Sequence, residues 1–199
     1  MDAEPQSPGR TRSPFEDLRR AVMARLRELD FKTTGGVARL LADGNAGVIE
    51  FQKSGRSTPH DTTFTLNVGI ALGALLPGTN KKPLSHCSVA ECHARLRLGE
   101  LREPPSDLWW TLVNGSEGAG ELPKVLGEVL ERVETDAVPL VRRYTAAGAL
   151  AALWESGSSL GTTPAQRKDF LRRLGTNPGT PEATPTDAPT APPSTPLAW

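Results

Sequence analysis

The chain combines a balanced charge with many prolines and few aromatic residues. It has 199 residues, with 23 Lys and Arg against 23 Asp and Glu, 18 Pro, 19 Gly and 5% aromatic residues. This composition excludes a membrane span, a coiled coil and a polybasic nucleic-acid binder. The longest apolar run, Gly69 to Leu76, is too short to span a bilayer, and the N-terminus lacks the apolar run of a secretory signal. We therefore expect a cytoplasmic protein.

Proline is concentrated at the two ends of the chain. Residues 1–14 and 176–199 together hold 10 of the 18 prolines and few apolar side chains. Such segments bury too little apolar surface to offset the entropy lost on ordering. We predict a disordered extension at 1–14, a single domain at 15–175 and a disordered Pro/Thr-rich tail at 176–199. The domain has 21 basic and 19 acidic residues, a net charge of +2, which gives no electrostatic reason to expect binding to nucleic acid or to a membrane.

The first predicted element is a helix over residues 14–29. Ser13 is a suitable N-cap, Pro14 fits the first helical position, and Glu16 stands three residues after the cap. Apolar residues then recur at helical spacing, with arginines on the opposite side. They are Phe15, Leu18, Val22, Leu26 and Leu29.

The period of the apolar residues then changes to two, which indicates β-strands. We predict strands at 37–41, 48–53, 64–70 and 92–98, turns at 45–47 and 55–61, and a loop at 77–85. In the last strand, alternation turns Cys92, Ala94 and Leu96 inward. Short connections between the first three strands favour an antiparallel meander with one buried face and one polar face.

The C-terminal third returns to helical spacing. We predict helices at 122–133 and 138–153, separated by Asp136 and Pro139, and a short third helix that begins at Pro164 and ends near Gly175. The predicted fold class is therefore α+β. It has an N-terminal helix, an antiparallel sheet of about four strands with one polar face, and C-terminal helices packed on the other face.

Five short segments stand in a recognisable order along the chain. They are LDFK at 29–32, VIEFQKS at 48–54, FTLNVGI at 64–70, Cys92 with RLRLGEL at 95–101, and DLWW at 107–110. In this order the chain resembles the bacterial domain of unknown function 4304 family, over about residues 15–155. The resemblance implies one α+β domain. Because the family is named for having no assigned activity, it transfers no catalytic residue.

The polar face of the predicted sheet holds the candidate binding residues. Alternation that turns Phe51, Leu66 and Leu96 inward turns their polar neighbours outward. The candidates are Gln52, Asn67, Arg95 and Arg97, with Lys53 and Ser54 at a strand end and Trp110 as a partly exposed ring. Amide, hydroxyl and guanidinium donors suit a carboxylate or phosphate ligand. The alternatives are a merely solvated sheet face and core packing of the tryptophans.

The cysteines and their histidine neighbours do not predict chemistry. Cys87 and Cys92 stand beside His86 and His93, but their spacing matches none of the usual zinc patterns, and alternation turns Cys92 and His93 to opposite sides. No base or helix N-terminus is placed to activate either thiol. We therefore predict a buried structural Cys92, and no metal, cofactor or catalytic residue.

Three functional interpretations remain open. The first is a binding or interaction module whose polar sheet face engages a protein or a small anionic ligand. The second is a hydrolase or transferase in which Arg95 and Arg97 hold an anionic substrate and Glu50, His60 or Glu100 transfers protons. The third is an immunity-like or regulatory protein that binds one partner enzyme. The lack of a self-sufficient catalytic group favours the first.

Overall fold

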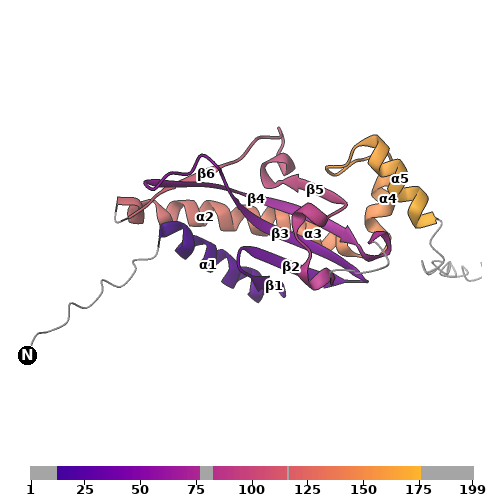
Figure 1. The fold of residues 1–199 in the computed structure, drawn as a ribbon, viewed down its shortest axis with the longest axis horizontal. Coiled ribbons are helices and arrows are strands. Elements are labelled where there is room, and N and C mark those ends of the chain that lie inside the picture. The colour runs from indigo at the N-terminus through magenta and orange to yellow at the C-terminus, as the bar shows by residue number, and fades with distance from the viewer. Residues whose placement is uncertain (1–12, 77–82, 116, 176–199) are drawn as a thin grey trace, which may run out of the picture.

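A layer of helices packs against one six-stranded sheet in the computed structural model, which describes residues 13–76, 83–115 and 117–175 (Figure 1). The helices are α1 (Pro14–Glu28), α2 (Leu122–Arg132), α3 (Val138–Thr145), α4 (Ala149–Glu155) and α5 (Pro164–Gly175). The strands are β1 (Lys32–Thr34), β2 (Val37–Ala42), β3 (Asn45–Lys53), β4 (Asp61–Leu72), β5 (Ala94–Arg97) and β6 (Trp110–Val113). The predicted tail lies outside the described residues, as does the predicted extension up to residue 12. Ser13 and Pro14 belong to the start of α1.

Helix α1 forms as its sequence predicts. The Ser13 side chain accepts the Glu16 N–H at 3.3 Å, and Pro14 occupies the first turn. Phe15, Leu18, Val22 and Leu26 are buried at helical spacing. This apolar stripe packs α1 onto the sheet, with the arginines on the other side of the helix.

All strands of the sheet are antiparallel, and the fold class is confirmed as α+β. The strand order is β1-β2-β3-β4-β5, and β6 also pairs with β4. The long strand β4 pairs with β6 over 61–64 and with β5 over 67–70. Residues 98–109, here called the β5–β6 connection, leave the sheet edge between these two pairings. The sheet has six strands, more than the four expected, because β1 and β6 are too short to show a clear alternation.

The turn predicted at 45–47 is wrong, because these residues belong to β3. The chain reverses instead at Asp43 and Gly44, whose φ angles of +50° and +73° suit a tight hairpin. Asn45 stands in the strand and uses its amide for tertiary contacts. Its Nδ2 donates to the Thr145 carbonyl at 3.0 Å, and its Oδ1 accepts the Gly73 N–H at 3.2 Å.

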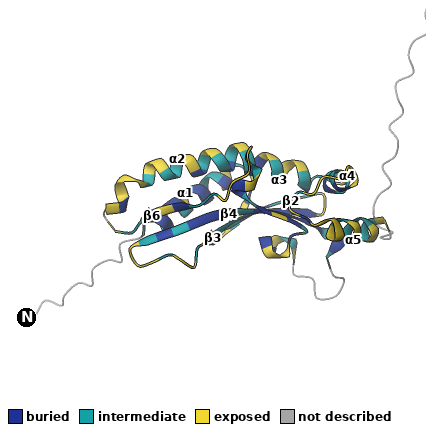
Figure 2. Cartoon of the chain, turned by 90° about the horizontal axis from the view of Figure 1, so that it is seen from above, coloured by how far each residue is buried: buried dark blue, intermediate teal, exposed yellow. Residues whose placement is uncertain are grey.

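Helices α1, α2 and α3 lie on one face of the sheet, here called the inner face (Figure 2). The main core lies between these helices and the sheet, and it includes Ile49, Leu66, Val68 and Leu112. Helix α3 packs close against β3 at Gly47. A Cβ atom there would lie 2.2 Å from Val141 Cγ1, so only glycine allows this packing distance.

The helix break predicted between Asp136 and Pro139 is wrong. The chain stays helical from α2 into α3 through a π-helical turn at Val133–Ala137, and Pro139 falls in the first turn of α3. Proline has no backbone N–H to donate, and the wider π-helical turn before it lets the helix continue without that hydrogen bond. The chain breaks instead before α4, at Gly148, whose φ is +72°.

The opposite, outer face of the sheet is partly covered by residues 83–93, here called the cover segment. Its buried residues pack on the outward side chains of β3 and β4 in a small apolar cluster. The cluster contains Ala46, Val48, Ala71, Cys87, Val89 and Cys92. The prediction that Cys92 joins Ala94 and Leu96 in the main core is therefore wrong. Cys92 precedes β5 and lies over the other face of the sheet. Gly69 makes room for it, since a Cβ there would lie 2.6 Å from Cys92 Sγ.

Candidate functional site

A cavity of about 580 Å³ opens on the outer face, beside the cover segment. Four of the predicted outward residues, Gln52, Asn67, Arg95 and Arg97, line it together. Its other lining residues are Glu50, Phe51, Lys53, Val89, Ala90, Leu96 and Glu100. We call it the outer cavity. The structure thus brings the predicted polar residues of three strands into one site.

Strand register sets the order of the side chains in this cavity. Asn67 of β4 pairs with Glu50 of β3 on one side and with Arg97 of β5 on the other. Residues directly opposite each other in antiparallel strands share a face, so these three form a row. Asn67 Nδ2 also donates to Gln52 Oε1 at 2.7 Å. This bond leaves the Gln52 side-chain NH₂ group and the Asn67 side-chain oxygen Oδ1 without partners among the described residues.

Arg95 lines the cavity without forming an ion pair within the described residues. Its side chain is exposed, and its Nη1 donates to the Ala90 carbonyl at 3.1 Å. No carboxylate in the described ranges forms an ion pair with it. The bond to the cover segment orients the guanidinium group and leaves its other N–H donors for a ligand.

Arg97 is already held by a carboxylate of the same chain. Its Nη1 forms an ion pair with Asp107 Oδ1, and its guanidinium carbon lies 4.9 Å from the centre of the Trp109 ring. Hydrogen bonds from Arg97 and then from Trp109 lower the pKa of Asp107. Arg97 is therefore oriented by two contacts from the β5–β6 connection.

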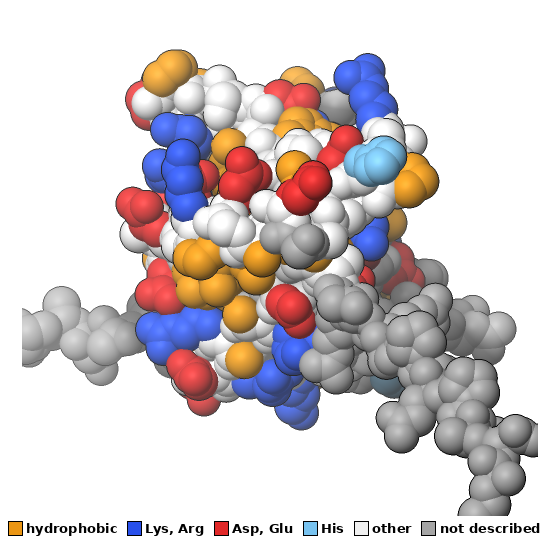
Figure 3. All heavy atoms as spheres, turned by 90° about the vertical axis from the view of Figure 1, so that its left-hand side faces the viewer, with side chains coloured by type: hydrophobic (Ala, Val, Ile, Leu, Met, Phe, Trp, Pro, Cys, Tyr) orange, Lys and Arg blue, Asp and Glu red, His pale blue; other side chains and the backbone are white. Residues whose placement is uncertain are grey.

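Two carboxylates face the arginines in the outer cavity. Glu50 Oε2 accepts the Val89 N–H at 2.8 Å, and Glu100 Oε1 accepts the Arg97 backbone N–H at 2.9 Å. Both groups thus fix the cavity walls. His60, the third proton-transfer candidate from the sequence, does not line this cavity. Mixed charge also marks the end of the molecule seen in Figure 3, where basic and acidic side chains are interspersed.

The other three predicted site residues are Lys53, Trp110 and Ser54, and only Lys53 lines the outer cavity. Lys53 lines the cavity, but its ammonium group contacts α1, lying 3.9 Å from a Glu16 carboxylate oxygen and 4.4 Å from the centre of the Phe15 ring. Trp110 is only 6% exposed, and its ring stacks on Phe64 in the core, so the choice of Trp110 as the exposed ring is wrong. Ser54 lines a neighbouring cavity.

This neighbouring cavity has a volume of about 640 Å³ and is lined by Ser54, Arg56, Thr63, Arg97, Asp107 and Trp109. We call it the tryptophan cavity. Arg97 lines both cavities and is the side chain at which they meet. Trp109, which is partly buried, takes the place that the sequence analysis gave to Trp110.

A scan against models of protein families matches residues 22–143 to a domain of unknown function, DUF4304. The chain belongs to this family. A search of curated proteins and a search of solved structures each found no match. The match contains β3, β4, β5 and the β5–β6 connection, so both cavities of this DUF4304 chain lie within the family domain. No helix in the described ranges is long and apolar enough to cross a membrane.

The cysteines of the DUF4304 domain act as packing residues under the cover segment. Cys87 and Cys92 are both buried, and no disulfide joins them to each other. Interaction with the neighbouring Cys87 sulfur, followed by burial, raises the pKa of Cys92, which keeps it a neutral thiol. Within the described residues, no group of three or more His, Cys, Asp and Glu side chains is placed to hold a metal ion.

Sequence reasoning missed Asp107 and Trp109, although both stand in one of the family segments. The signal that identifies Trp109 is the alternation of β6. Trp110 and Leu112 are apolar and Thr111 is polar, so Trp109 belongs with Thr111 on the outer side. No local pattern predicts the Asp107 contact, because it joins a loop residue to a strand residue ten positions earlier.

Proposed function

We propose that this DUF4304 chain is a binding module whose outer cavity receives a carboxylate or phosphate group. The observation that carries the proposal is Arg95, an exposed guanidinium without an ion-pair partner among the described residues, beside the Gln52–Asn67 amide pair. Arg95 supplies charge-assisted hydrogen bonds to an anionic group. The two amides supply one donor group and one acceptor to its polar neighbours.

The mixed charge of the cavity limits the ligand to one with localised acidic groups. Glu50 and Glu100 line the same space as Arg95, and Arg97 is paired with Asp107. A polyanion such as a nucleic-acid backbone requires a run of uncompensated cations, which this cavity does not offer. The anionic group belongs either to a small molecule or to an acidic side chain of a protein partner. That partner can be a single enzyme, as in the immunity-like or regulatory interpretation.

The proposal is tested by titrating two kinds of probe against the purified chain. One arm uses inorganic phosphate and acetate, and the other uses an acidic peptide, acetyl-Glu-Ser-Glu-amide. Backbone amide NMR shifts of Asn67 and Arg95 report binding. We expect Arg95→Ala to weaken binding about tenfold, because a charge-assisted hydrogen bond contributes roughly 1.5–3 kcal/mol.

Arg102→Ala is the matched control. Arg102 is exposed on the β5–β6 connection, and its side chain forms no hydrogen bond or ion pair in the described part of the chain. Its loss removes the same charge without altering the cavity. Equal binding by the Arg95→Ala variant and the unchanged protein contradicts the proposal, and so does the absence of shifts with every probe. Preference for the peptide identifies a protein partner, whereas preference for phosphate identifies a small ligand.

An enzymatic role predicts a different result. If Glu50 or Glu100 transfers protons to an anionic substrate held by Arg95, Glu50→Gln or Glu100→Gln leaves substrate binding nearly intact and abolishes turnover. A binding module shows no turnover in any variant. A panel of phosphate and carboxylate ester substrates separates these two outcomes.

A further inference from the structure

The guanidinium of Arg97 already binds a carboxylate, which comes from its own chain. Asp107 accepts a hydrogen bond from Arg97 Nη1, and the neighbouring Trp109 side chain also helps to lower the pKa of the Asp107 carboxylate. The Trp109 ring also lies against the guanidinium group, which fixes its plane. Arg97, held by the Trp109 ring, is therefore preorganised to bind a carboxylate at the junction of the two cavities.

The contact between Asp107 and Arg97 is one that another carboxylate can replace. Its side chain is 66% exposed, and it stands on the β5–β6 connection, outside helix and strand. Exposed ion pairs contribute little to stability and are screened by salt. The contact is also incomplete, because the buried Nε of Arg97 has no hydrogen-bond partner in the described residues. A carboxylate that binds Nε and one Nη together satisfies this donor.

We propose that Arg97 and Trp109 form a second carboxylate receptor of the same site, which Asp107 fills in the free chain, so that the ligand carries two carboxylates. This inference rests on the proposed function, in which Arg95 receives the first acidic group. Arg56 lines the tryptophan cavity beside Arg97, and its exposed side chain has no ion-pair partner in the described ranges. It adds a second cation to that cavity.

Strand geometry sets the spacing between the two acidic groups. Arg95 and Arg97 stand two residues apart in β5 and line the same cavity, so their backbones are roughly 6.6 Å apart. Alternate residues of an extended polypeptide have the same spacing. The matching ligand is a polypeptide segment with acidic residues at alternate positions, or a free dicarboxylate of similar length such as adipate.

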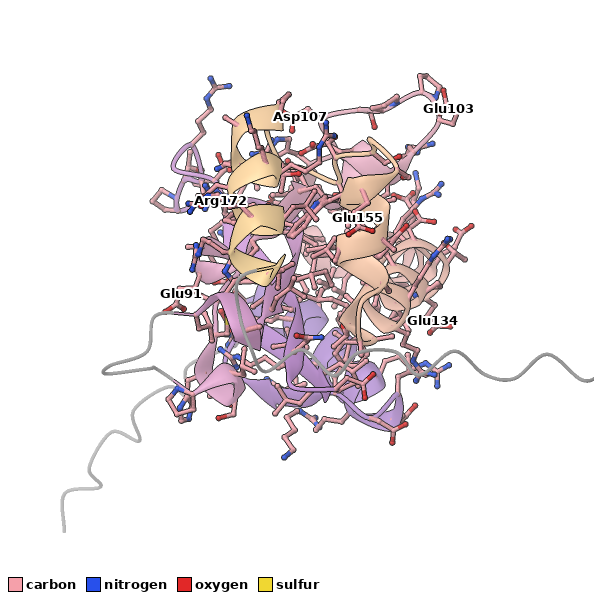
Figure 4. The ribbon with its side chains drawn as sticks, turned by 90° about the vertical axis from the view of Figure 1, so that its right-hand side faces the viewer. Glu91, Glu103, Asp107, Glu134, Glu155 and Arg172 are labelled. Atoms are coloured by element: carbon pink, nitrogen blue, oxygen red, sulfur yellow. The ribbon has the colours of Figure 1, made fainter. Side chains whose placement is uncertain are left out.

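The central experiment compares Asp107→Asn with Glu103→Gln. Both change an exposed acidic residue of the β5–β6 connection, and Figure 4 labels the two at separate points. Glu103 forms no hydrogen bond or ion pair in the described part of the chain, so its loss controls for net charge. We expect Asp107→Asn to raise the affinity for adipate by up to about fivefold at low salt, because an exposed ion pair competes by about that factor. We expect Glu103→Gln to change the affinity for adipate much less, because it removes the same charge without freeing Arg97.

The peptide arm tests the spacing of the two carboxylates. Acetyl-Glu-Ser-Glu-amide is compared with acetyl-Glu-Glu-Ser-amide, which has the same composition and charge. We expect the alternating peptide to bind more tightly, and adipate to bind more tightly than acetate. Trp109→Phe keeps the aromatic ring but removes the indole N–H, and we expect it to weaken adipate binding. Thermal unfolding of each variant verifies that it is folded.

The outcomes separate this inference from the proposed function. If Arg95→Ala weakens binding but Asp107→Asn lowers the affinity or leaves it unchanged, Asp107 is not a competitor, the second receptor is refuted, and the proposed function stands. Equal binding of adipate and acetate, or of the two peptides, refutes the two-carboxylate ligand. If no probe binds to any folded variant, the proposed function fails together with the inference.

Discussion

The two faces of the sheet are covered in different ways, although the same strands supply both. On the inner face, helices α1, α2 and α3 bury a continuous apolar core against β3 and β4. On the outer face, the outer cavity opens beside the cover segment, and the tryptophan cavity is lined in part by the β5–β6 connection. Because side chains alternate along a strand, one strand serves stability on one side and a polar site on the other.

One glycine on each face lies in close contact with its covering layer. Gly47 faces α3, and Gly69 faces Cys92 of the cover segment. The same substitution to alanine therefore probes both faces with the same added volume. We expect its consequences to differ, because helix α3 is part of the main core, whereas the cover segment forms a wall of the outer cavity.

Gly47→Ala has the largest expected effect. The added methyl group would lie 2.2 Å from Val141 Cγ1 and 2.7 Å from Thr145 Oγ1, so α3 must move away from the sheet. Overpacking of this kind costs about 2–3 kcal/mol. Denaturant unfolding measures the loss, with Gly55→Ala as the control, since nothing lies within 4 Å of a Cβ at Gly55. Equal stability of the two variants would show that α3 is not tightly packed.

Gly69→Ala tests the outer face. A Cβ atom there would lie 2.6 Å from Cys92 Sγ and 2.8 Å from Cys92 Cβ, which displaces the cover segment. We expect a smaller loss of stability, about 1–2 kcal/mol, because the cluster beneath the segment is small. Val89 and Ala90 line the outer cavity, so ligand affinity falls as well. Unfolding and probe titration are measured on the same variant. Unchanged binding would show that the cover segment does not contribute to the binding site.

Acid is expected to lower the stability of the fold at His93, which lies against α5. His93 accepts the Leu72 N–H through Nδ1 and contacts the Phe170 ring, and burial, followed by the Arg173 charge, lowers its pKa to about 4. The unfolded chain binds the proton near pH 6.5, so it holds more protons than the folded chain between these values. Stability contributed by neutral His93 is therefore present above pH 6.5 and falls towards pH 4. His93→Gln should flatten this part of the stability curve, and an unchanged slope contradicts the assignment.

Asp107→Asn has the smallest expected effect on stability. The Asp107 carboxylate is exposed and its ion pair with Arg97 lies at the surface, so the thermal midpoint should stay unchanged at neutral pH. The variant nevertheless alters ligand affinity in the test of the second receptor. A clear drop in the midpoint would place Asp107 among the structural residues of the outer face and weaken the contrast between the two faces.

Local patterns predicted much of this fold. Capping signals at Ser13 and Pro14 located α1, and alternation located four strands and turned Gln52 and Asn67 outward. Alternation loses its force at strand ends. Cys92 precedes β5, so packing against Gly69 decides its side, and the Lys53 ammonium group turns towards α1 although the residue lines the outer cavity. The break predicted near Pro139 is absent because a π-helical turn carries the chain from α2 into α3, and the chain breaks at Gly148 instead.

By itself, the sequence determined the α+β class, the family and the residues that share the polar face. The class and the shared face follow from periodicity, which depends on covalent geometry within a few residues, whereas the family follows from the order of short segments along the chain. Tertiary structure decided which of those residues are neighbours. Register placed Asn67 between Glu50 and Arg97, the cover segment closed one wall of the cavity, and the β5–β6 connection brought Asp107 to Arg97. Such contacts depend on packing between segments distant in sequence, which no local pattern encodes.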